Sequence, residues 1–383
     1  MLDGLDNIPW ETLNHAYGSA EDVPDLLRAL THDGDDIRDM TLYTLYSNLW
    51  YQGTVYQATA YAVPFLIELL SASSVTRKYD ILIYLAHLAS GNSYLDAHNE
   101  QFLSEQAQES DAYKDRLDQE LSYVKCTHHA VRDGIDIYLQ LLLDDHEELH
   151  TRMAVPYLLA CFPEHQATIV PHLKQVLPDE PHRLMRSSII LALRYLQDGQ
   201  DTTYQLEPYL APDEDLIVRT CSAMAVAQID EKNTPPRVIN LLLEILKNSS
   251  SIEEDYEQLT WSEGDIMGDI CKALMHVGYA QLEPIIPDMV SVLRRVDFFS
   301  ALTCVDALLY IVFGGIPLAP TQTAHDLTHH QRMVLEAVLN SPNTWRISLN
   351  EGETMLNGNI GTMMQAYNLP SNPDAMRDFL HRE

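Results

Sequence analysis

The feature that most constrains the fold is a pattern that recurs five times along the chain. In each copy, an arginine and a long run of apolar residues follow a polar turn, as in PDEDLIVRTCSAMAVAQID at 212–230. Apolar residues in this copy recur at the spacing of one helical face and extend around much of the helix. Such a helix must be covered by neighbours of its own kind. The other copies lie at 34–50, 73–89, 147–162 and 181–198.

The start of the 212–230 segment combines a helix cap with a charged residue. Asp213 follows a proline, so its carboxylate is expected to cap the first turn, where Glu214 and Asp215 also suit the positive end of the helix dipole. Arg219 lies off the centre of the apolar face. An arginine there can bond a carboxylate or a neighbouring carbonyl. We expect a structural ion pair; the alternative is a direct role in binding.

A second pattern, a helix that contains proline, precedes four of these copies. Its copies read VPDLLRAL at 23–30, VPFLIELL at 63–70, VPHLKQVL at 170–177 and EPYL at 207–210. Val63 follows Val23 by 40 residues, and Glu207 follows Val170 by 37. This period is typical of a solenoid built from two-helix repeats.

The paired helices resemble HEAT repeats over most of residues 20–313, and DEDLIVRTCSAMAVAQI resembles the form found in phycobilin-lyase-like HEAT proteins. The opening IPWETLNHAYGSAEDVPDLLRAL, with LWYQGTVYQATAYAVPFL, resembles bacterial HEAT-repeat proteins without assigned activity. The resemblance implies an all-α protein, an α-solenoid of about seven repeats, and no particular chemistry. We expect this solenoid to span residues 1–313. Residues 314–383 are expected to form a loop and a C-terminal helical cap.

Two acidic stretches, at about 91–125 and 247–265, interrupt the repeats. The first contains Asp96, Glu100, Glu105, Glu109, Asp111, Asp115, Asp118 and Glu120 against Lys114 and Arg116. The second contains Glu253, Glu254, Asp255, Glu257, Glu263 and Asp265 against Lys247. In a regular solenoid both would project from its edges and carry function. The alternative for the first is that it extends the helix that follows.

The net charge of −32 excludes two classes of partner. Nucleic acids and anionic membranes both require clusters of Lys and Arg, which this chain does not offer. A basic protein is the natural complement, since opposite potentials steer association; the alternative is that the acidity serves solubility alone. MLDGLDNIPW does not read as a secretory signal, and the apolar windows are too short for a membrane span or are interrupted by Asp306. We therefore expect a cytoplasmic protein.

An aromatic-rich segment is the best candidate for a contact surface. Six residues fall within it: Tyr43, Tyr46, Trp50, Tyr51, Tyr56 and Tyr61. Tyr and Trp dominate interface hot spots, but they also pack well between helices. Trp50, Tyr51 and Tyr56, which flank a turn at Gly53, are the predicted contacts. Glu253, Glu254, Asp255 and Glu257 are expected to steer the partner, and Trp261 is expected to act as a further anchor.

Metal and catalytic motifs are weak. The five cysteines are scattered, which is typical of reduced core residues, and Cys126 beside His128 and His129 lacks paired metal-ligand spacing. His325 and His329 lie four residues apart beside Asp326 on an expected helix, where a metal site and a solvated face are the alternatives. No nucleophile, phosphate-binding or dinucleotide motif is found. We expect no enzymatic activity, cofactor or metal.

These observations favour a protein-binding solenoid, most concretely an immunity-type inhibitor that captures a basic toxin or effector. A scaffold or adaptor, or a lyase-like enzyme that handles a small ligand in a concave groove, is the alternative. The sequence leaves the oligomeric state open.

Overall fold

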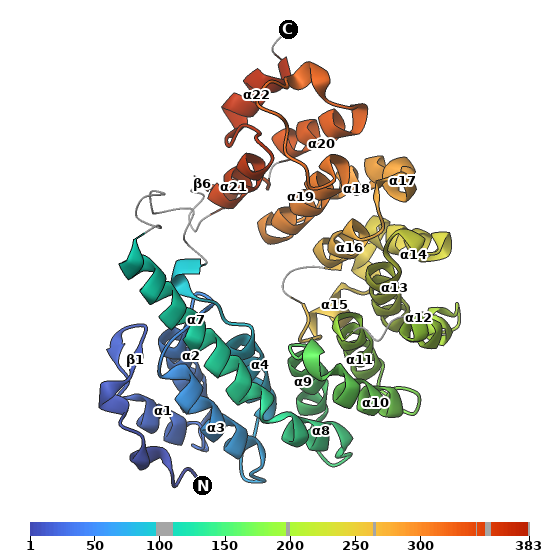
Figure 1. The fold of residues 1–383 in the computed structure, drawn as a ribbon. Helices are drawn as coiled ribbons and strands as arrows, with labels where there is room; N and C mark the ends of the chain where they lie inside the picture. Colours follow the sequence, from blue (N-terminus) through green and yellow to red (C-terminus); the bar gives the residue numbers. More distant parts are fainter. Residues whose placement is uncertain (97–109, 197–199, 263–265, 342, 349–353, 382–383) are drawn as a thin grey trace. The chain divides into compact units, whose positions relative to one another are not determined.

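The computed structural model describes residues 1–96, 110–196, 200–262, 266–341, 343–348 and 354–381 and shows a predominantly helical protein (Figure 1). The described strands are two or three residues long and pair only as three small antiparallel hairpins. The all-α fold class is therefore confirmed. The chain divides into two compact units, residues 1–179 and residues 180–383.

The first unit contains short 3-10 turns, two hairpins, and helices of both the proline-containing and the arginine-containing kind. Its elements are η1 (Leu5–Asn7), η2 (Trp10–Thr12), β1 (Asn14–His15), β2 (Gly18–Ser19), α1 (Val23–Ala29), α2 (Asp35–Leu49), β3 (Trp50–Tyr51), β4 (Thr54–Val55), α3 (Thr59–Leu70), α4 (Lys78–Ala89), α7 (Asp111–Arg132), α8 (Ile135–Leu143), α9 (Leu149–Leu159), η3 (Pro163–His165) and α10 (Gln166–Val176).

Several helices of this unit pack directly on one another. The proline-containing helix α1 contacts α2 and α3, α3 contacts α4, and α4 contacts α9, which in turn packs on α8. The helix faces that meet are those with the apolar spacing: Leu45 of α2, Leu82 and Leu85 of α4 and Leu158 of α9 are completely buried. Side chains also join α2 to α4, since the Tyr84 ring of α4 lies 4.4 Å from the Tyr46 ring of α2, so α2, α4 and α9 are neighbours.

The hairpin β3–β4 joins α2 to α3 through a two-residue turn. Gln52 and Gly53 have φ angles of 51° and 86°, the left-handed pair that a type I′ turn requires. The backbone N–H groups of Asn92 and Val55 donate to the carbonyls of Gly53 and Asn92, respectively, which fastens the hairpin to the segment after α4. A Cβ on Gly91 would lie 2.3 Å from Val55 Cγ1, so this close approach requires glycine.

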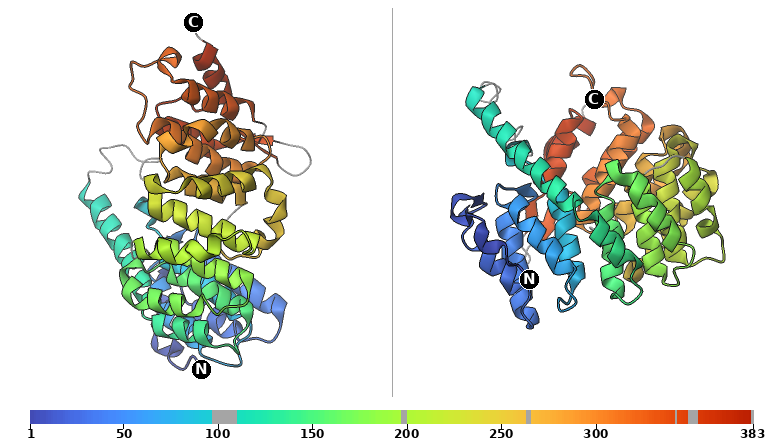
Figure 2. Two further views of the ribbon diagram at one scale, coloured as in Figure 1. Left: turned by 90° about the vertical axis from the view of Figure 1, so that its right-hand side faces the viewer. Right: turned by 60° about the horizontal axis from the view of Figure 1, so that its bottom comes forward.

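The described part of the first acidic stretch agrees with the alternative prediction, in which this stretch extends the helix that follows it. Residues 111–125 belong to α7, which packs on α3 and α4, while its N-terminal half extends beyond them (Figure 2). Asp111, Asp115 and Asp118 are exposed there. Glu120 instead accepts hydrogen bonds from Ser93 Oγ and the Leu95 N–H. Glu100, Glu105 and Glu109 lie outside the described residues.

The second unit continues with helices up to the C-terminal region. Its elements are α11 (Arg183–Tyr195), α12 (Gln200–Leu206), η4 (Glu207–Leu210), α13 (Leu216–Asp230), η5 (Glu231–Asn233), α14 (Pro236–Lys247), η6 (Ser249–Ser251), α15 (Glu253–Glu257), α16 (Ile266–Met275), α17 (Tyr279–Leu282), η7 (Glu283–Ile285), α18 (Ile286–Val292), α19 (Phe298–Phe313), η8 (Ala324–Asp326), α20 (His329–Asn340), β5 (Arg346–Ser348), β6 (Thr354–Leu356), α21 (Gly358–Ala366) and α22 (Pro373–His381).

Two rows of helices run through the second unit (Figure 1). In one row α11 packs on α13, α13 on α16 and α16 on α19; in the other α14 packs on α18 and α18 on α20. α13 is buried along nearly its whole length, as a helix that is apolar on several sides must be. Of the helices after residue 313, α20 and α21 contact α19. The predicted boundary at 313 stays a prediction.

The cap of α13 differs from the prediction by two residues. The helix begins at Leu216, and Asp215 is its N-cap, with the Asp215 carboxylate accepting from the Ile217 N–H at 3.1 Å. Asp213 lies in the preceding turn and is exposed. Three neighbouring carboxylates could each cap a helix, and the sequence alone did not distinguish among them.

The second acidic stretch forms part of the core as far as residue 262. η6 and α15 lie within it, and Ile252, Tyr256, Leu259 and Trp261 are buried. An insertion anchored by four buried side chains does not simply project from an edge. Glu263 and Asp265 lie outside the described residues. Within the described parts of the chain, no helix is both long enough and apolar enough to cross a membrane.

A candidate partner-binding surface on the first unit

Aromatic side chains gather on α2, α4 and α9 of the first unit. We call this set the aromatic stripe; it consists of Tyr43, Tyr46, Trp50, Tyr79, His87, His150 and Tyr157. Tyr43, Tyr46 and Trp50 are spaced by three and four residues, and His150 and Tyr157 by seven, so each set shares one side of its helix. None of these side chains is fully buried.

The rings at the C-terminal ends of the three helices touch one another. The Trp50 ring stacks on His87 with centroids 5.1 Å apart, and His87 meets Tyr157 edge-on at 6.3 Å. A hydrogen bond of 2.9 Å joins Tyr46 Oη to His87 Nδ1. Beneath them the buried Tyr84 hydroxyl donates to the Leu45 carbonyl. This network links α2, α4 and α9 and fixes the positions of the rings.

The N-terminal part of the stripe is more open. Tyr43 is 71% exposed and His150 is exposed, while the rings of Tyr79 and His150 lie 5.9 Å apart across α4 and α9. Arg77 lies over the Tyr79 ring at 5.7 Å and donates from Nε to Tyr79 Oη. The stripe therefore already holds one arginine of its own chain.

The other predicted aromatic contacts lie beside the stripe in a cluster of tyrosines. Tyr51 is 40% exposed and meets Tyr17, which is 67% exposed, edge-on at 5.8 Å. Burial raises the pKa of Tyr56 to about 12, helped by the nearby charge of Glu120 and the phenols of Tyr17, Tyr51 and Tyr94. The structure thus brings Tyr51 and Tyr56 together with two tyrosines that sequence reasoning missed, Tyr17 and Tyr94.

Acidic residues dominate the edge where α2, α4 and α9 begin. Nine carboxylates stand there against four cations: Asp33, Asp35, Asp36, Asp39, Asp80, Asp144, Asp145, Glu147 and Glu148 against Arg38, Arg77, Lys78 and Arg152. The cations form ion pairs with some of these carboxylates. Arg77 lies 2.7 Å from Asp39 and 2.8 Å from Asp80, and Lys78 lies 2.6 Å from Glu147. The edge therefore keeps a surplus of negative charge.

A hollow of about 500 Å³ lies at the same edge, between residues 71–77 and 144–148. Its lining contains Lys78 and Glu147, which bond to each other. Because these two charges neutralise each other, they do not define the charge of a ligand. The lining of the hollow therefore does not indicate which kind of ligand would bind there.

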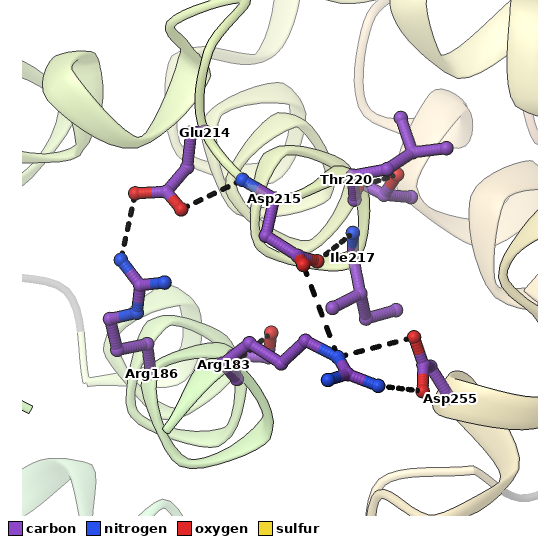
Figure 3. Close-up of polar contacts among 9 residues, drawn as sticks. Arg183, Arg186, Glu214, Asp215, Ile217, Thr220 and Asp255 are labelled. Atoms are coloured by element: carbon purple, nitrogen blue, oxygen red, sulfur yellow. Dashed lines mark hydrogen bonds and ion pairs between the residues drawn. The ribbon is translucent and has the colours of Figure 1, made fainter. Parts of the chain in front are cut away.

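The steering residues predicted on the second unit have different environments. Asp255 is held by Arg183, whose Nη2 and Nε lie 2.6 and 3.3 Å from its two carboxylate oxygens (Figure 3). Glu253 accepts a hydrogen bond from Ser249 Oγ. Glu254 and Glu257 are exposed. Glu254 and Glu257 therefore keep an exposed charge, whereas the charge of Asp255 is neutralised by Arg183.

The structure places Trp261 in the core and not on the surface. Trp261 is 7% exposed, its Nε1 donates to Ser188 Oγ at 2.9 Å, and its ring stacks parallel to Tyr195 at 5.7 Å. The buried Arg194 lies over both rings. Trp261 therefore fastens the insertion to α11, and the prediction that it anchors a partner does not fit this burial.

Arg219 also differs from expectation. Among the described residues it takes part in no ion pair, and its Nε is buried without a hydrogen-bond partner. The equivalent arginine of the preceding copy instead forms such an ion pair, since Arg186 Nη1 bonds Glu214 at 2.8 Å (Figure 3). The acidic turn before α13 thus serves the arginines of α11, and Arg183 also approaches Asp215 at 4.0 Å.

The histidines singled out as possible metal ligands have other neighbours. His325 lies in η8 and His329 begins α20, so the two do not share one helix, and the Asp326 carboxylate bonds Thr323 in a capping box. His128 bonds the Ala89 carbonyl and Glu164 through its two ring nitrogens. Among the described residues, no three His, Cys, Asp or Glu side chains group as metal ligands.

Comparisons with known proteins do not place the chain in a family. No protein-family model matches the chain, and no curated protein matches it. The HEAT resemblance stays a prediction, and functional inference depends on the surface described above.

Proposed function

We propose that the protein is a non-enzymatic binding protein built as an α-solenoid of HEAT-like repeats, and that it captures a basic protein partner in the manner of an immunity-type inhibitor. The observation that carries the proposal is the aromatic stripe, where partly exposed rings from three neighbouring helices lie beside a carboxylate-rich edge. Large, rigid aromatic side chains are the residues that contribute most to protein interfaces.

Charge selects the class of partner. With a net charge of −32, the chain attracts positively charged surfaces over a distance and repels acidic ones. The exposed carboxylates of α7, together with Glu254 and Glu257, contribute to this attraction. We expect them to raise the association rate, while the rings of the stripe slow dissociation.

The pairing of successive helices supports the solenoid part of the proposal. Within each unit, several helices that adjoin in the chain pack as pairs: α1 on α2, α3 on α4 and α8 on α9 in the first unit, and α12 on α13 and α18 on α19 in the second. This nearest-neighbour packing is how a repeat protein buries a continuous core and exposes a long face for binding.

The test is capture of a partner from the source cell with the full chain as bait. We expect a basic protein whose association rate falls as salt rises, since exposed charges are screened over about 8 Å at physiological ionic strength. Tyr43→Ala should speed dissociation, and Tyr204→Ala, which removes an 82% exposed ring from α12 of the second unit, should not. Recovery of an acidic protein, or turnover of a small molecule, would contradict the proposal.

A further inference from the structure

The rings of the aromatic stripe offer a defined chemistry for side chains of a bound protein. The faces of Tyr and Trp rings carry negative potential and attract cations within about 6 Å of the ring centre. Tyr43 is largely exposed, and Trp50 and Tyr157 are partly exposed. Tyr43 lies on α2, Trp50 on β3 directly after it, and Tyr157 on α9, so a bound segment that reached all of them would also cross α4.

The chain itself shows how such rings hold an arginine. In the second unit, the Arg194 guanidinium carbon lies 4.6 Å from the centre of the Tyr195 ring and 5.7 Å from that of Trp261. Arg194 Nη2 also bonds Tyr195 Oη at 2.9 Å. In the first unit Arg77 lies over Tyr79. In both places the cation is an arginine.

The carboxylates beside the stripe add a second reason to expect a cation. The nine acidic residues at the start of α2, α4 and α9 outnumber the four cations there, and Asp36 and Glu148 are exposed without an ion pair among the described residues. These carboxylates lie at the opposite ends of α2 and α9 from Trp50 and Tyr157, so further arginines of a bound segment would meet them, and the planar fork of arginine suits a carboxylate. Lysine offers a compact, strongly hydrated charge that stacks less well.

Resting on the proposed function, we propose that the partner's contact segment carries arginines, and that their guanidinium groups lie on the rings of Tyr43, Trp50 and Tyr157. Trp50 and Tyr157 both pack against the His87 ring, with centroid distances of 5.1 and 6.3 Å, so two of the three rings are held in place by the same side chain.

The experiment titrates the full chain with three capped nonapeptides in which glycine alternates with arginine, with lysine or with citrulline, the uncharged analogue of arginine. We expect the arginine peptide to bind about 3- to 10-fold more tightly than the lysine peptide at equal salt, because each stacked guanidinium contributes a small gain. The citrulline peptide should not bind. Acrylamide quenching provides a second readout, because Trp50 is partly exposed while Trp10, Trp261 and Trp345 are buried.

Matched variants separate ring stacking from general charge attraction. Tyr43→Leu and Tyr157→Leu should each lower the affinity for the arginine peptide about 2- to 5-fold. Tyr43→Phe keeps the ring, so it should leave this affinity unchanged. Tyr204→Leu in the second unit is the control and should leave it unchanged.

Three results would overturn the inference: equal affinity for the arginine and lysine peptides, Tyr→Leu variants that bind normally, or binding of the arginine peptide that leaves Trp50 as open to quenching as before. If a captured basic protein binds the Tyr→Leu variants as tightly as wild type, the arginine contacts are refuted but the proposed function is not. A captured partner that is not basic would refute the proposed function itself.

Discussion

The ion pair between Lys78 and Glu147 permits a quantitative test of how the helices of the first unit are joined. Lys78 begins α4 and Glu147 precedes α9, and their side chains are only 11% and 13% exposed with Nζ and Oε2 2.6 Å apart. Removing one partner of a buried pair strands the other charge, which typically costs 3–5 kcal/mol. Because this pair lies close to the surface, we expect Lys78→Met to cost about 3 kcal/mol.

The double variant tests the reasoning behind that figure. Glu147→Gln keeps an oxygen that can accept from Lys78, so it should cost about 1–2 kcal/mol. In Lys78→Met/Glu147→Gln neither charge remains, and the protein should return to within about 1 kcal/mol of wild type. The coupling between the two sites is then about 3–5 kcal/mol, far above the scatter expected for independent sites.

Hydrogen exchange of the α4 and α9 amides measures the stability change of each variant directly. It reports the opening of the first unit alone, whereas global unfolding of a chain with two units need not be two-state. The control is Arg28→Gln, which breaks the exposed pair of Arg28 with Asp6 and should leave exchange in α4 and α9 unchanged. A double variant no more stable than Lys78→Met would refute the account of this pair.

Three further predictions concern the second unit and acid stability. Trp261→Leu should destabilise the second unit by about 3 kcal/mol, because it opens a cavity and strands Ser188, and urea unfolding of the variant checks this. Arg186→Met should cost about 1–3 kcal/mol by leaving Glu214 unpaired, whereas Arg219→Met should change the same unfolding free energy by less than about 1 kcal/mol; the reverse order would contradict the assignment. Burial alone would raise the pKa of Glu164, but the hydrogen bond and charge of His128, a backbone hydrogen bond and the charge of His165 together outweigh it, so the pKa lies below its ordinary value of 4.5. Its contribution to stability is thus complete above that ordinary value and is lost as pH falls through the lowered pKa. Glu164→Gln should make acid unfolding less steep, and an unchanged pH profile would count against the His128 contact.

The helical architecture could be read from the sequence because its signals are local. Apolar spacing, the proline of the first helix and the arginine of the second located α1, α2, α3, α4, α9, α10, α11 and α13 to within a few residues. The cap of α13 was misplaced because Asp213, Glu214 and Asp215 have the same chemistry, and only the backbone path selects Asp215. Similarly, a 3-10 turn that ends at Asp326 separates His325 from His329, which helical spacing alone had joined.

The candidate site was harder to predict because it depends on contacts between segments distant in sequence. Trp50, Tyr51 and Tyr56 were singled out by local density. Packing of the helices adds His87 and Tyr157 beside Trp50, and Tyr17 and Tyr94 beside Tyr51 and Tyr56. The one available signal was spacing: Tyr79, Ile83 and His87 recur every fourth residue on α4, and His150 and Tyr157 are seven apart on α9. The prediction that Trp261 is a surface anchor was wrong because the segment around it is rich in charged residues, although its apolar residues are buried with Trp261.

The central claim is that a basic protein is captured on the aromatic stripe, and site-specific photo-crosslinking in the source cell tests it most directly. A photoreactive phenylalanine analogue would replace Tyr43 on α2 or, as the matched control, Tyr204 on α12; both positions are highly exposed, at 71% and 82%. The account predicts one cross-linked species, formed from position 43 and containing a basic protein, with none from position 204. Cross-linking from position 204 but not from position 43 would contradict it.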